Sequence, residues 1–459
     1  MLLPTRWPRR RHLTTIILPT LLFSIQTSAE DILFSTASSQ RVQDPFLNPP
    51  PSTCPVVQDG STYDTFPWTY NPPCVNAVIP NKNGLGIHQT FCAYTNTYYN
   101  NGRGISFVVS PEVAASITSE TFSLGVGGLE GMVGEEMGMW EIDKAGSGKG
   151  KGLFATNDVA GIFAGEKVIV QTPALFVDKA LMGTPSTARR QFVLAKAVEQ
   201  LPETTRKMVR ILHANRDGSV EDVVTTNGVS VEWPWVDENP KLFALIPEVA
   251  RINHACRPNT SWRFDDYTLS FEIFALRDIK PGEEITRSYG FERQPHAQRL
   301  ESLRENHGFT CACRLCTANA TTIEASNRRL TQIADLKAVL PTSQSDIPQL
   351  IGLLPDLISL LEEEELVDEL QLYEEILAYT WSSFGIEDRA RYWAGRASQH
   401  WAVMAGRESW EAKRCADMEK DVKGHSTWMS WDGEDPWEGV GEGHPWDEKD
   451  HAHEHDHEH

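Results

Sequence analysis

Long apolar runs, cysteines and basic residues are all scarce in this 459-residue chain, and each scarcity excludes a class of protein. Hydrophobic residues make up 40% and charged residues 23%, which excludes a polytopic membrane protein and a wholly disordered chain. Eight cysteines are too few for a small disulfide scaffold. Acidic residues outnumber basic ones by 63 to 42, so nucleic-acid binding through bulk electrostatics is not expected.

Residues 1–29 have the order of a secretory signal peptide. Arginines at positions 6 and 9–11 precede an apolar run over residues 13–25, and small residues end at Ala29. This order predicts a cleaved signal and a secretory or secreted protein. The run is short for a bilayer, so no membrane span is expected after cleavage. The alternatives are an uncleaved anchor or a mitochondrial presequence; without a signal, the expected compartment is the nucleus or cytoplasm.

Residues 30–140 form a turn-rich segment that contains three cysteines. In an oxidising compartment this composition predicts a disulfide, either Cys54–Cys74 or Cys74–Cys92. Because three is an odd number, the remaining thiol is free or pairs elsewhere, with Cys415 as one candidate. The segment contains no catalytic signature.

Short strand patterns and turns dominate residues 141–317. Apolar and polar side chains alternate over residues 268–275, which is the period of a half-buried strand. A second strand pattern covers residues 166–170, and a helix is expected over about 188–212. These features predict an α+β, β-rich fold rather than a doubly wound parallel sheet.

Residues 318–410 carry apolar stripes at helical spacing, which predict antiparallel helix pairs in a repeat-like domain. Pro355 is expected to break or kink one helix, and Glu362–Glu365 is expected to face solvent. Residues 411–459 form an acidic tail that ends in five alternating histidines. We expect this tail to be solvated and disordered, with weak chelation of zinc, copper or nickel as the alternative. Tryptophans that could dock the tail on the body are Trp428, Trp431, Trp437 and Trp446.

The glycine-rich stretch Gly148-Lys149-Gly150-Lys151-Gly152 predicts a turn that can approach a ligand closely. It does not end in Gly-Lys-Ser/Thr and lacks the Gly-x-Gly-x-x-Gly spacing, which excludes a Walker loop and a dinucleotide fingerprint. Alone, the stretch indicates only a turn.

Histidine and cysteine gather in two further motifs. Asn253-His254-Ala255-Cys256 places an amide, an imidazole and a thiol within four residues. Cys311-x-Cys313-x2-Cys316, preceded by Phe309, places three thiols within six residues. A structural zinc site needs four ligands, so the fourth must come from elsewhere, and Cys256 is the obvious candidate. A disulfide among the crowded thiols is the alternative, because the predicted signal leads to an oxidising compartment.

The order of these motifs resembles SET-domain lysine methyltransferases with a post-SET cysteine cluster. GKGKGLFA is followed by RINHACRPN, GEEITRSYG and CACRLC. Glu284-Ile285-x3-Tyr289 matches the family's Glu-Leu-x3-Tyr element, with isoleucine in place of leucine. The SET-and-MYND-like branch is the most similar, since a helical repeat domain follows its cysteine cluster too. This chain departs from that branch, because residues 153–255 hold no cysteine for a MYND zinc insert and residues 30–140 have no counterpart there.

The resemblance implies a β-rich SET fold with a knot-like crossing, a post-SET zinc cluster and S-adenosyl-L-methionine as cofactor. The residues implied to hold the cofactor are Lys149, Gly150 and Lys151 along its methionine part, Asn253 and His254 mainly through backbone groups, Phe309 against the adenine, and Tyr289. The residues implied to bind zinc are Cys256, Cys311, Cys313 and Cys316. Tyr289 is the implied catalytic hydroxyl, which orients the substrate amine.

The implied reaction is in-line attack of a neutral lysine amine of a protein or peptide substrate on the sulfonium methyl group. The rival hypothesis is a secreted or lumenal binding protein that keeps the SET scaffold without turnover. The signal peptide and the acidic tail favour this rival, because histones and the cofactor are intracellular. We expect a monomer that does not bind nucleic acid directly. Two glycosylation patterns occur; Asn319 is expected to be exposed, and Asn259 to be a buried structural residue.

Overall fold

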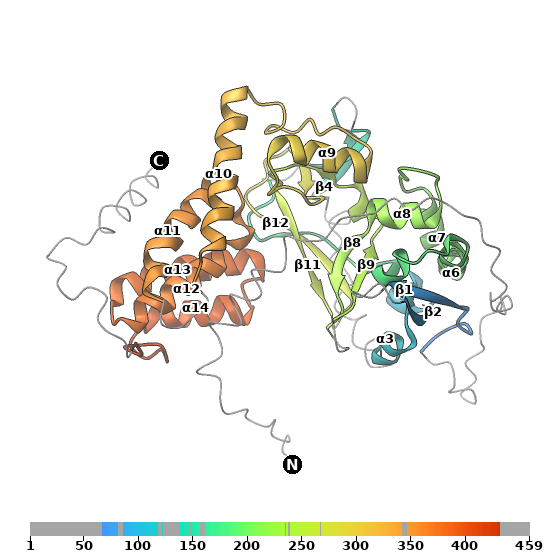
Figure 1. The fold of residues 1–459 in the computed structure, drawn as a ribbon, viewed down its shortest axis with the longest axis horizontal. Helices are drawn as coiled ribbons and strands as arrows, with labels where there is room; N and C mark the ends of the chain where they lie inside the picture. Colours follow the sequence, from blue (N-terminus) through green and yellow to red (C-terminus); the bar gives the residue numbers. More distant parts are fainter. Residues whose placement is uncertain are drawn as a thin grey trace, which may run out of the picture. The chain divides into compact units, whose positions relative to one another are not determined.

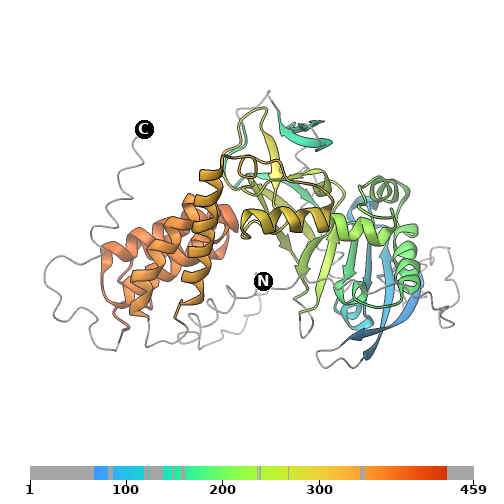
Figure 2. The ribbon, with the colours of Figure 1, turned by 45° about the horizontal axis from the view of Figure 1, so that its top comes forward.

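The computed structural model describes residues 67–80, 86–117, 122, 138–146, 149–156, 161–234, 236, 239–266, 268–341 and 347–431. The predicted signal peptide, Cys54 and the acidic end from residue 432 lie outside these residues. The described chain divides into a β-rich unit, which runs to Glu292 and again over His296–Thr317, and a helical unit, which comprises Arg293–Pro295 and the chain from Ala318 (Figures 1 and 2). Within the described ranges, no helix is both long enough and apolar enough to cross a membrane.

The largest sheet of the β-rich unit has six strands: β1 (Cys74–Pro80), β2 (Gly86–Asn96), β3 (Ile105–Val109), β7 (Leu175–Asp178), β8 (Val229–Glu232) and β9 (Lys241–Leu245). Their order is β1-β2-β3-β7-β9-β8, and only β3 and β7 pair in parallel. Because β3 pairs with β7, the sheet joins the predicted segments 30–140 and 141–317. The described part of the first segment therefore belongs to the same compact unit as the second.

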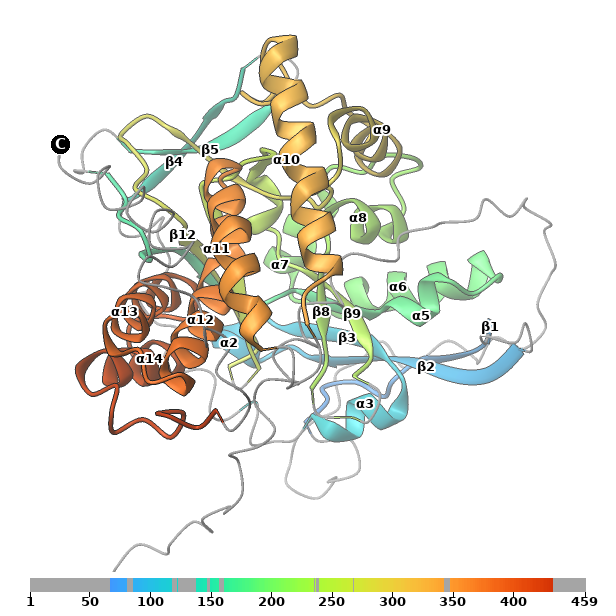
Figure 3. The same ribbon diagram turned by 60° about the vertical axis from the view of Figure 1, so that its left-hand side comes forward.

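Both faces of this sheet are buried. Ile105, Phe107 and Val109 of β3 pack in one core, while Val108 packs in a second core on the other face. Helix α6 (Thr187–Glu199) lies across β1, β2 and β3 and contributes to the second core (Figure 3). The helix expected over 188–212 is in fact two helices, α6 and α7 (Glu203–Arg210). They are separated because proline disfavours helical backbone in the residue before it, here before Pro202.

Two smaller sheets carry the sequence motifs. One contains β4 (Trp140–Lys144), β5 (Lys151–Ala155), β10 (Asn253–His254) and β13 (Glu284–Arg287), in the order β10-β13-β5-β4. The other contains β6 (Lys167–Gln171), β11 (Thr260–Asp265) and β12 (Ser270–Ala275), in the order β11-β12-β6. The strand predicted over residues 268–275 is confirmed by β12. β10 runs parallel to β13, with His254 opposite Arg287, so the segment around Asn253 meets the segment that leads to Tyr289.

The remaining helices of this unit are short, apart from α9, which follows β13. Those in the described ranges are α2 (Tyr99–Gly102), α3 (Pro111–Ser116), α5 (Lys179–Met182), α8 (Val220–Asn227), the 3-10 turn η1 (Val249–Arg251) and α9 (His296–His307).

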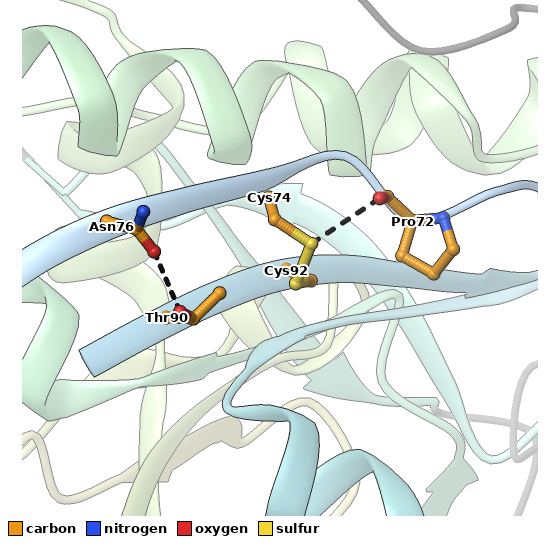
Figure 4. The surroundings of a disulfide bond; sticks show 5 residues. All are labelled: Pro72, Cys74, Asn76, Thr90 and Cys92. Atoms are coloured by element: carbon orange, nitrogen blue, oxygen red, sulfur yellow. Dashed lines mark hydrogen bonds between the residues drawn. A yellow bond between two sulfur atoms is a disulfide. The ribbon is translucent and has the colours of Figure 1, made fainter. Parts of the chain in front are cut away.

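A disulfide joins Cys74 of β1 to Cys92 of β2 (Figure 4). The two residues are directly opposite each other in the antiparallel ladder. Two positions further along, the Thr90 hydroxyl donates a 2.7 Å hydrogen bond to Asn76 Oδ1 across the same pair of strands. The disulfide is thus one of the two pairings that the sequence left open. Cys415 has a free, buried thiol.

The helical unit contains α10 (Ala320–Ala338), α11 (Pro348–Glu363), the 3-10 turn η3 (Val367–Glu369), α12 (Leu370–Ser383), α13 (Glu387–Met404) and α14 (Trp410–Lys420). Consecutive helices pack on each other around one core of leucine and aromatic side chains (Figure 3). The predicted helical stripes are therefore confirmed.

Three details of the helical unit differ from the sequence expectations. α11 continues through Pro355, because buried leucines on both sides, including Leu354 and Leu357, hold it in the core. Glu364 does not face solvent: it is 3% exposed and pairs with Arg329 at 2.6 Å. The helical region also extends beyond residue 410.

The segment predicted to be a tail begins instead with α14, which packs on α13. Met418 and Val422 are buried in the helical core. Trp428 packs against the same core, and the Trp431 ring lies 5.4 Å from that of Phe384. Trp428 and Trp431 thus dock on the helical unit, a possibility that the sequence left open; Trp437 and Trp446 lie outside the described residues.

Candidate functional site

Glu284, the first residue of β13, connects the glycine-rich turn with Asn253. Its Oε2 accepts a hydrogen bond from Lys149 Nζ at 2.8 Å, and its Oε1 accepts one from Asn253 Nδ2 at 2.8 Å. Asn253 Nδ2 also donates to the carbonyl oxygen of Lys151 at 3.2 Å. Gly152 permits this close packing, because a Cβ there would lie 2.7 Å from Asn253 Nδ2. One carboxylate therefore holds the turn and the asparagine together.

Tyr289 is fixed at both its backbone and its hydroxyl. The hydroxyl donates a 2.9 Å hydrogen bond to the carbonyl oxygen of Ile252, and the backbone N–H donates one to His254 Nδ1 at 3.1 Å. Burial raises the pKa of Tyr289, and the nearby Arg287 guanidinium opposes this only in part. The side chain is therefore a neutral phenol at pH 7. With its proton engaged by Ile252, the oxygen can still accept a hydrogen bond.

The imidazole of His254 links Tyr289 to the cysteine cluster. Because Nδ1 accepts the Tyr289 N–H, the ring proton is assigned to Nε2, which lies 3.3 Å from Cys256 Sγ. Burial lowers the pKa of His254 to about 3. The resemblance implied mainly a backbone role for His254, and the structure adds this role for its side chain.

Three rings gather around Tyr289. Ring centroids lie 5.3 Å from Tyr289 for His254, 5.0 Å for His307 and 6.2 Å for Phe309. Among the described residues, the buried Nδ1 of His307 has no hydrogen-bond partner. Burial and the Arg287 charge lower the pKa of His307 to about 4, so its ring is neutral at pH 7.

The four sulfur atoms of Cys256, Cys311, Cys313 and Cys316 lie within 4.8 Å of one another. Cys256 Sγ is 3.8 Å from that of Cys311 and 3.5 Å from that of Cys316. A tetrahedral zinc with Zn–S bonds of about 2.3 Å places its sulfurs about 3.8 Å apart, so this donor set fits zinc. The four thiols are not joined by disulfides, and all four residues are buried.

Arg299 of α9 supports this cysteine cluster. It is 1% exposed, and its Nη2 lies 3.9 Å from Cys316 Sγ. A guanidinium beside thiolates offsets part of their negative charge and donates a hydrogen bond to sulfur.

The structure brings most of the predicted site residues into one region of the β-rich unit. Lys149 pairs with Glu284, Gly150 is exposed with a positive φ of 75°, and Lys151 contributes its carbonyl oxygen. Asn253, His254, Tyr289 and Phe309 lie with the cysteine cluster. The roles of all these residues toward a ligand remain predictions.

Sequence reasoning missed the roles of four polar residues in this region. It did not predict that Glu284 connects Lys149 with Asn253, and it did not single out Arg287, Arg299 or His307. Position alone could have drawn attention to two of them. Arg287 lies two residues before Tyr289 on the same strand path, and His307 lies two residues before Phe309. Arg299 has no local signal, because only the packing of α9 places it beside the cysteines.

Comparison with known families identifies a SET domain in this region. Residues 150–290 match the family model described as "SET domain". The matched range contains Asn253, Cys256, Glu284 and Tyr289 and ends before the second cysteine motif. The order of motifs in the sequence indicated the same domain.

The relatives include several lysine methyltransferases, each similar over a limited stretch. N-lysine methyltransferase SMYD2 of Homo sapiens is 42% identical over 96 residues, which is 20% of this chain and 21% of that protein. SMYD2-A of Danio rerio is 31% identical over 130 residues, 28% of this chain and 27% of that protein. Histone-lysine N-methyltransferase SET5 of Meyerozyma guilliermondii is 41% identical over 73 residues, which is 16% of this chain and 15% of that protein. The chain thus spans only 15% to 27% of the length of these relatives.

Two solved structures cover more of the chain at much lower similarity. One is the SET domain of LSMT bound to lysine and AdoHcy. The match covers 62% of this chain and 86% of the LSMT chain, with 9% identity and a TM-score of 0.23. The other is Rubisco LSMT bound to AdoMet. This match covers 75% of this chain and 100% of the Rubisco LSMT chain, with 10% identity and a TM-score of 0.22. Likeness at this level carries no argument about the site.

Proposed function

We propose that this protein is an S-adenosyl-L-methionine-dependent methyltransferase that acts on lysine side chains of a protein substrate. The SET-domain match and the methyltransferase names of its relatives support this function. The observation that carries it is the position of Tyr289, held by Ile252 and His254 beside Asn253 and the cysteine cluster. These are the groups that the proposed reaction needs in one place.

In this proposal, the cofactor supplies a methyl group on a sulfonium, and the protein aligns a lysine amine with it. Lysine has an ordinary pKa near 10.4 and must be neutral to react. The aromatic surroundings disfavour the ammonium form by desolvation. Tyr289 stays a neutral phenol, so its oxygen accepts a hydrogen bond from the amine rather than removing a proton. Alignment of this kind can contribute about 7–11 kcal/mol.

The cofactor would contact the residues that Glu284 organises. Lys149, Gly150 and Lys151 would lie along its methionine part, with Asn253 beside them. Phe309 would stack on the adenine. Zinc, bound by the four cysteines, would hold the segment of Phe309 in place and would take no part in the chemistry.

The secretory pathway is the proposed compartment. The basic, apolar and small-residue order of residues 1–29 supports it, as does the Cys74–Cys92 disulfide. Zinc thiolates are more typical of reducing compartments, which supports the nucleus or cytoplasm as the alternative. A catalytically inactive binding protein is the second candidate function, and the names of the relatives do not favour it.

Calorimetric titration of S-adenosylmethionine into the full chain, with metal analysis of the same sample, tests the proposal first. We expect binding, and one zinc per chain. A transfer assay with labelled cofactor and lysine-containing proteins then tests turnover. Binding without transfer to any protein would favour the non-catalytic candidate, and a folded chain that does not bind would refute the enzyme.

A further inference from the structure

Arg287 is a buried cation that faces no carboxylate among the described residues. The residue is 7% exposed, and its guanidinium carbon lies 4.5 Å from the centre of the Tyr289 ring. Its Nη1 donates to the carbonyl oxygen of Ser288 at 3.2 Å, while its Nε has no hydrogen-bond partner among the described residues. In that same part of the chain, no carboxylate lies within ion-pair distance of it. A buried charge without a partner is strongly unfavourable, so this arrangement needs an explanation.

Two other arginines of the same unit, the partly buried Arg103 and the buried Arg299, have anionic partners. Both terminal nitrogens of Arg103 bind the carboxylate of Glu248 at 2.7 Å. Arg299 lies beside the thiols of Cys316 and Cys256, which raise its pKa against the effect of burial. Burial lowers the pKa of Arg287, and Tyr289 alone opposes this.

The neighbouring groups do not supply the missing anion. Glu284 is the one carboxylate that acts on Tyr289, and it is already engaged by Lys149 and Asn253. The neighbouring side chain of Tyr289 is a neutral phenol, and the His307 ring is neutral as well. Within the described ranges, the charge of Arg287 therefore has no carboxylate that offsets it.

We propose that Arg287 binds a carboxylate of a ligand at this site, an inference that rests on the proposed function. The planar fork of a guanidinium matches a carboxylate in shape and donates two parallel hydrogen bonds. The amino-acid end of S-adenosylmethionine carries one carboxylate, and an acidic residue of the substrate protein carries another. Arg287 is in this view a binding residue, which the Glu-Ile-x3-Tyr motif does not specify.

The first experiment compares S-adenosylmethionine with its decarboxylated form, by calorimetry on the full chain. If the carboxylate is the cofactor's, the wild type prefers S-adenosylmethionine by about tenfold or more. Arg287→Met loses this preference, because its side chain has similar length without charge. Arg287→Lys keeps part of the preference for S-adenosylmethionine, because lysine keeps the positive charge but lacks the planar guanidinium that donates two parallel hydrogen bonds.

The second experiment titrates ¹³C-labelled acetate into the chain saturated with S-adenosylhomocysteine, followed by NMR. If the carboxylate belongs to the substrate protein, acetate binds beside the occupied cofactor site, and Arg287→Met abolishes this binding. If it belongs to the cofactor, S-adenosylhomocysteine blocks acetate. No preference in the first experiment and no acetate binding in the second would overturn the inference.

Thermal unfolding without ligand provides the control for folding. We expect Arg287→Met to unfold at the same or a higher temperature than the wild type, because it removes an unpaired buried charge. The matched variant Arg103→Met leaves Glu248 without its partner, so it should unfold at a lower temperature while binding S-adenosylmethionine normally. If the wild type binds no cofactor, the proposed function fails, whereas acetate titration of the unloaded chain still tests Arg287.

Discussion

The helical unit and the surroundings of Arg287 in the β-rich unit treat buried charge in opposite ways. In the helical unit, Glu374 and Glu375 are completely buried, yet each carboxylate has several donors. Glu374 accepts from Arg396 Nε at 2.9 Å and from His400 Nδ1 at 2.7 Å. Glu375 pairs with Arg414, which donates through Nη2 at 2.7 Å.

Two buried polar atoms near Tyr289 in the β-rich unit have no such partners. Arg287 Nε and His307 Nδ1 lack hydrogen-bond partners within the described ranges, and the Arg287 charge has no anion beside it. A network whose members are all satisfied gains nothing from a ligand and serves the fold. Unsatisfied buried groups point instead to a ligand that completes them. The comparison thus separates paired buried charge, such as that of Glu374 and Glu375, from the charge of Arg287, for which we propose a ligand.

The largest effect is expected from the cysteine cluster. Cys313→Ser removes one of four thiolates and should release the metal, since bound zinc contributes on the order of 10 kcal/mol to small zinc-dependent folds. We expect zinc content to fall from one per chain to none, with loss of cofactor binding. The measurement is elemental analysis together with calorimetry. Cys415→Ser is the matched control, because Cys415 is a buried cysteine outside the cluster; equal zinc loss in both variants would contradict the assigned site.

The largest effect on the rate of methyl transfer is expected at Tyr289. Tyr289→Phe removes the hydroxyl that orients the amine, so methyl transfer should fall about a hundredfold. Cofactor affinity should stay within a few-fold, because the backbone N–H that binds His254 is retained. A transfer assay with labelled methyl groups measures the rate, and calorimetry on the same samples measures the cofactor affinity. Loss of cofactor binding together with transfer would make Tyr289 a structural residue.

A third variant tests the satisfied network of the helical unit. Glu375→Gln leaves Arg414 without its charged partner, and breaking a buried pair in this way should cost about 3–5 kcal/mol. Glu387→Gln is the matched control: it breaks contacts with Arg391 at 2.6 Å and Lys423 at 2.7 Å at the surface, where solvent screens the charges, so its cost should be far smaller. Denaturant unfolding followed by tryptophan fluorescence measures both. Similar losses would mean that burial of Glu375 does not matter.

The sequence predicts which residues lie together where they belong to short motifs. Asn253, His254, Tyr289 and the four cysteines belong to three such motifs, and the parallel pairing of β10 with β13 brings the first two motifs together. Contacts between distant residues escape this reasoning. Lys149 and Glu284 are 135 positions apart, so neither residue alone predicts their ion pair.

The helical unit shows the same limit. Apolar stripes predict α10 to α13. α14 is rich in charged residues, so its sequence instead predicts part of the acidic tail over residues 411–459. Its apolar contacts, such as Met418, are few and become visible only beside α13. Glu364 belongs to an acidic run that predicts a solvated face; its partner Arg329 lies 35 positions earlier. Pairing partners, rather than composition, decide which of these acids is buried.

The smallest predicted effect comes from a buried carboxylate in the β-rich unit for which no ion pair is found in the described residues. Asp178 is 4% exposed and accepts a 2.8 Å hydrogen bond from the Ala180 N–H. Burial raises its pKa to about 6, and this hydrogen bond opposes the rise only in part. The ionised form is thus disfavoured in the folded state, so Asp178 destabilises the fold above pH 6. This penalty disappears as the pH falls through 6 toward the unfolded value near 4.

Asp178→Asn should therefore stabilise the chain by about 1–3 kcal/mol at pH 7.5, since asparagine can still accept the Ala180 N–H without a charge. The gain should shrink toward zero near pH 4, and denaturant unfolding at both pH values measures it. Asp278→Asn is the matched control, because exposed Asp278 also accepts a backbone N–H, from Ala164 at 2.9 Å. A gain that is independent of pH, or one shared by the control, would show that Asp178 is as well compensated as Glu375, and the contrast between the two units would not extend to this residue.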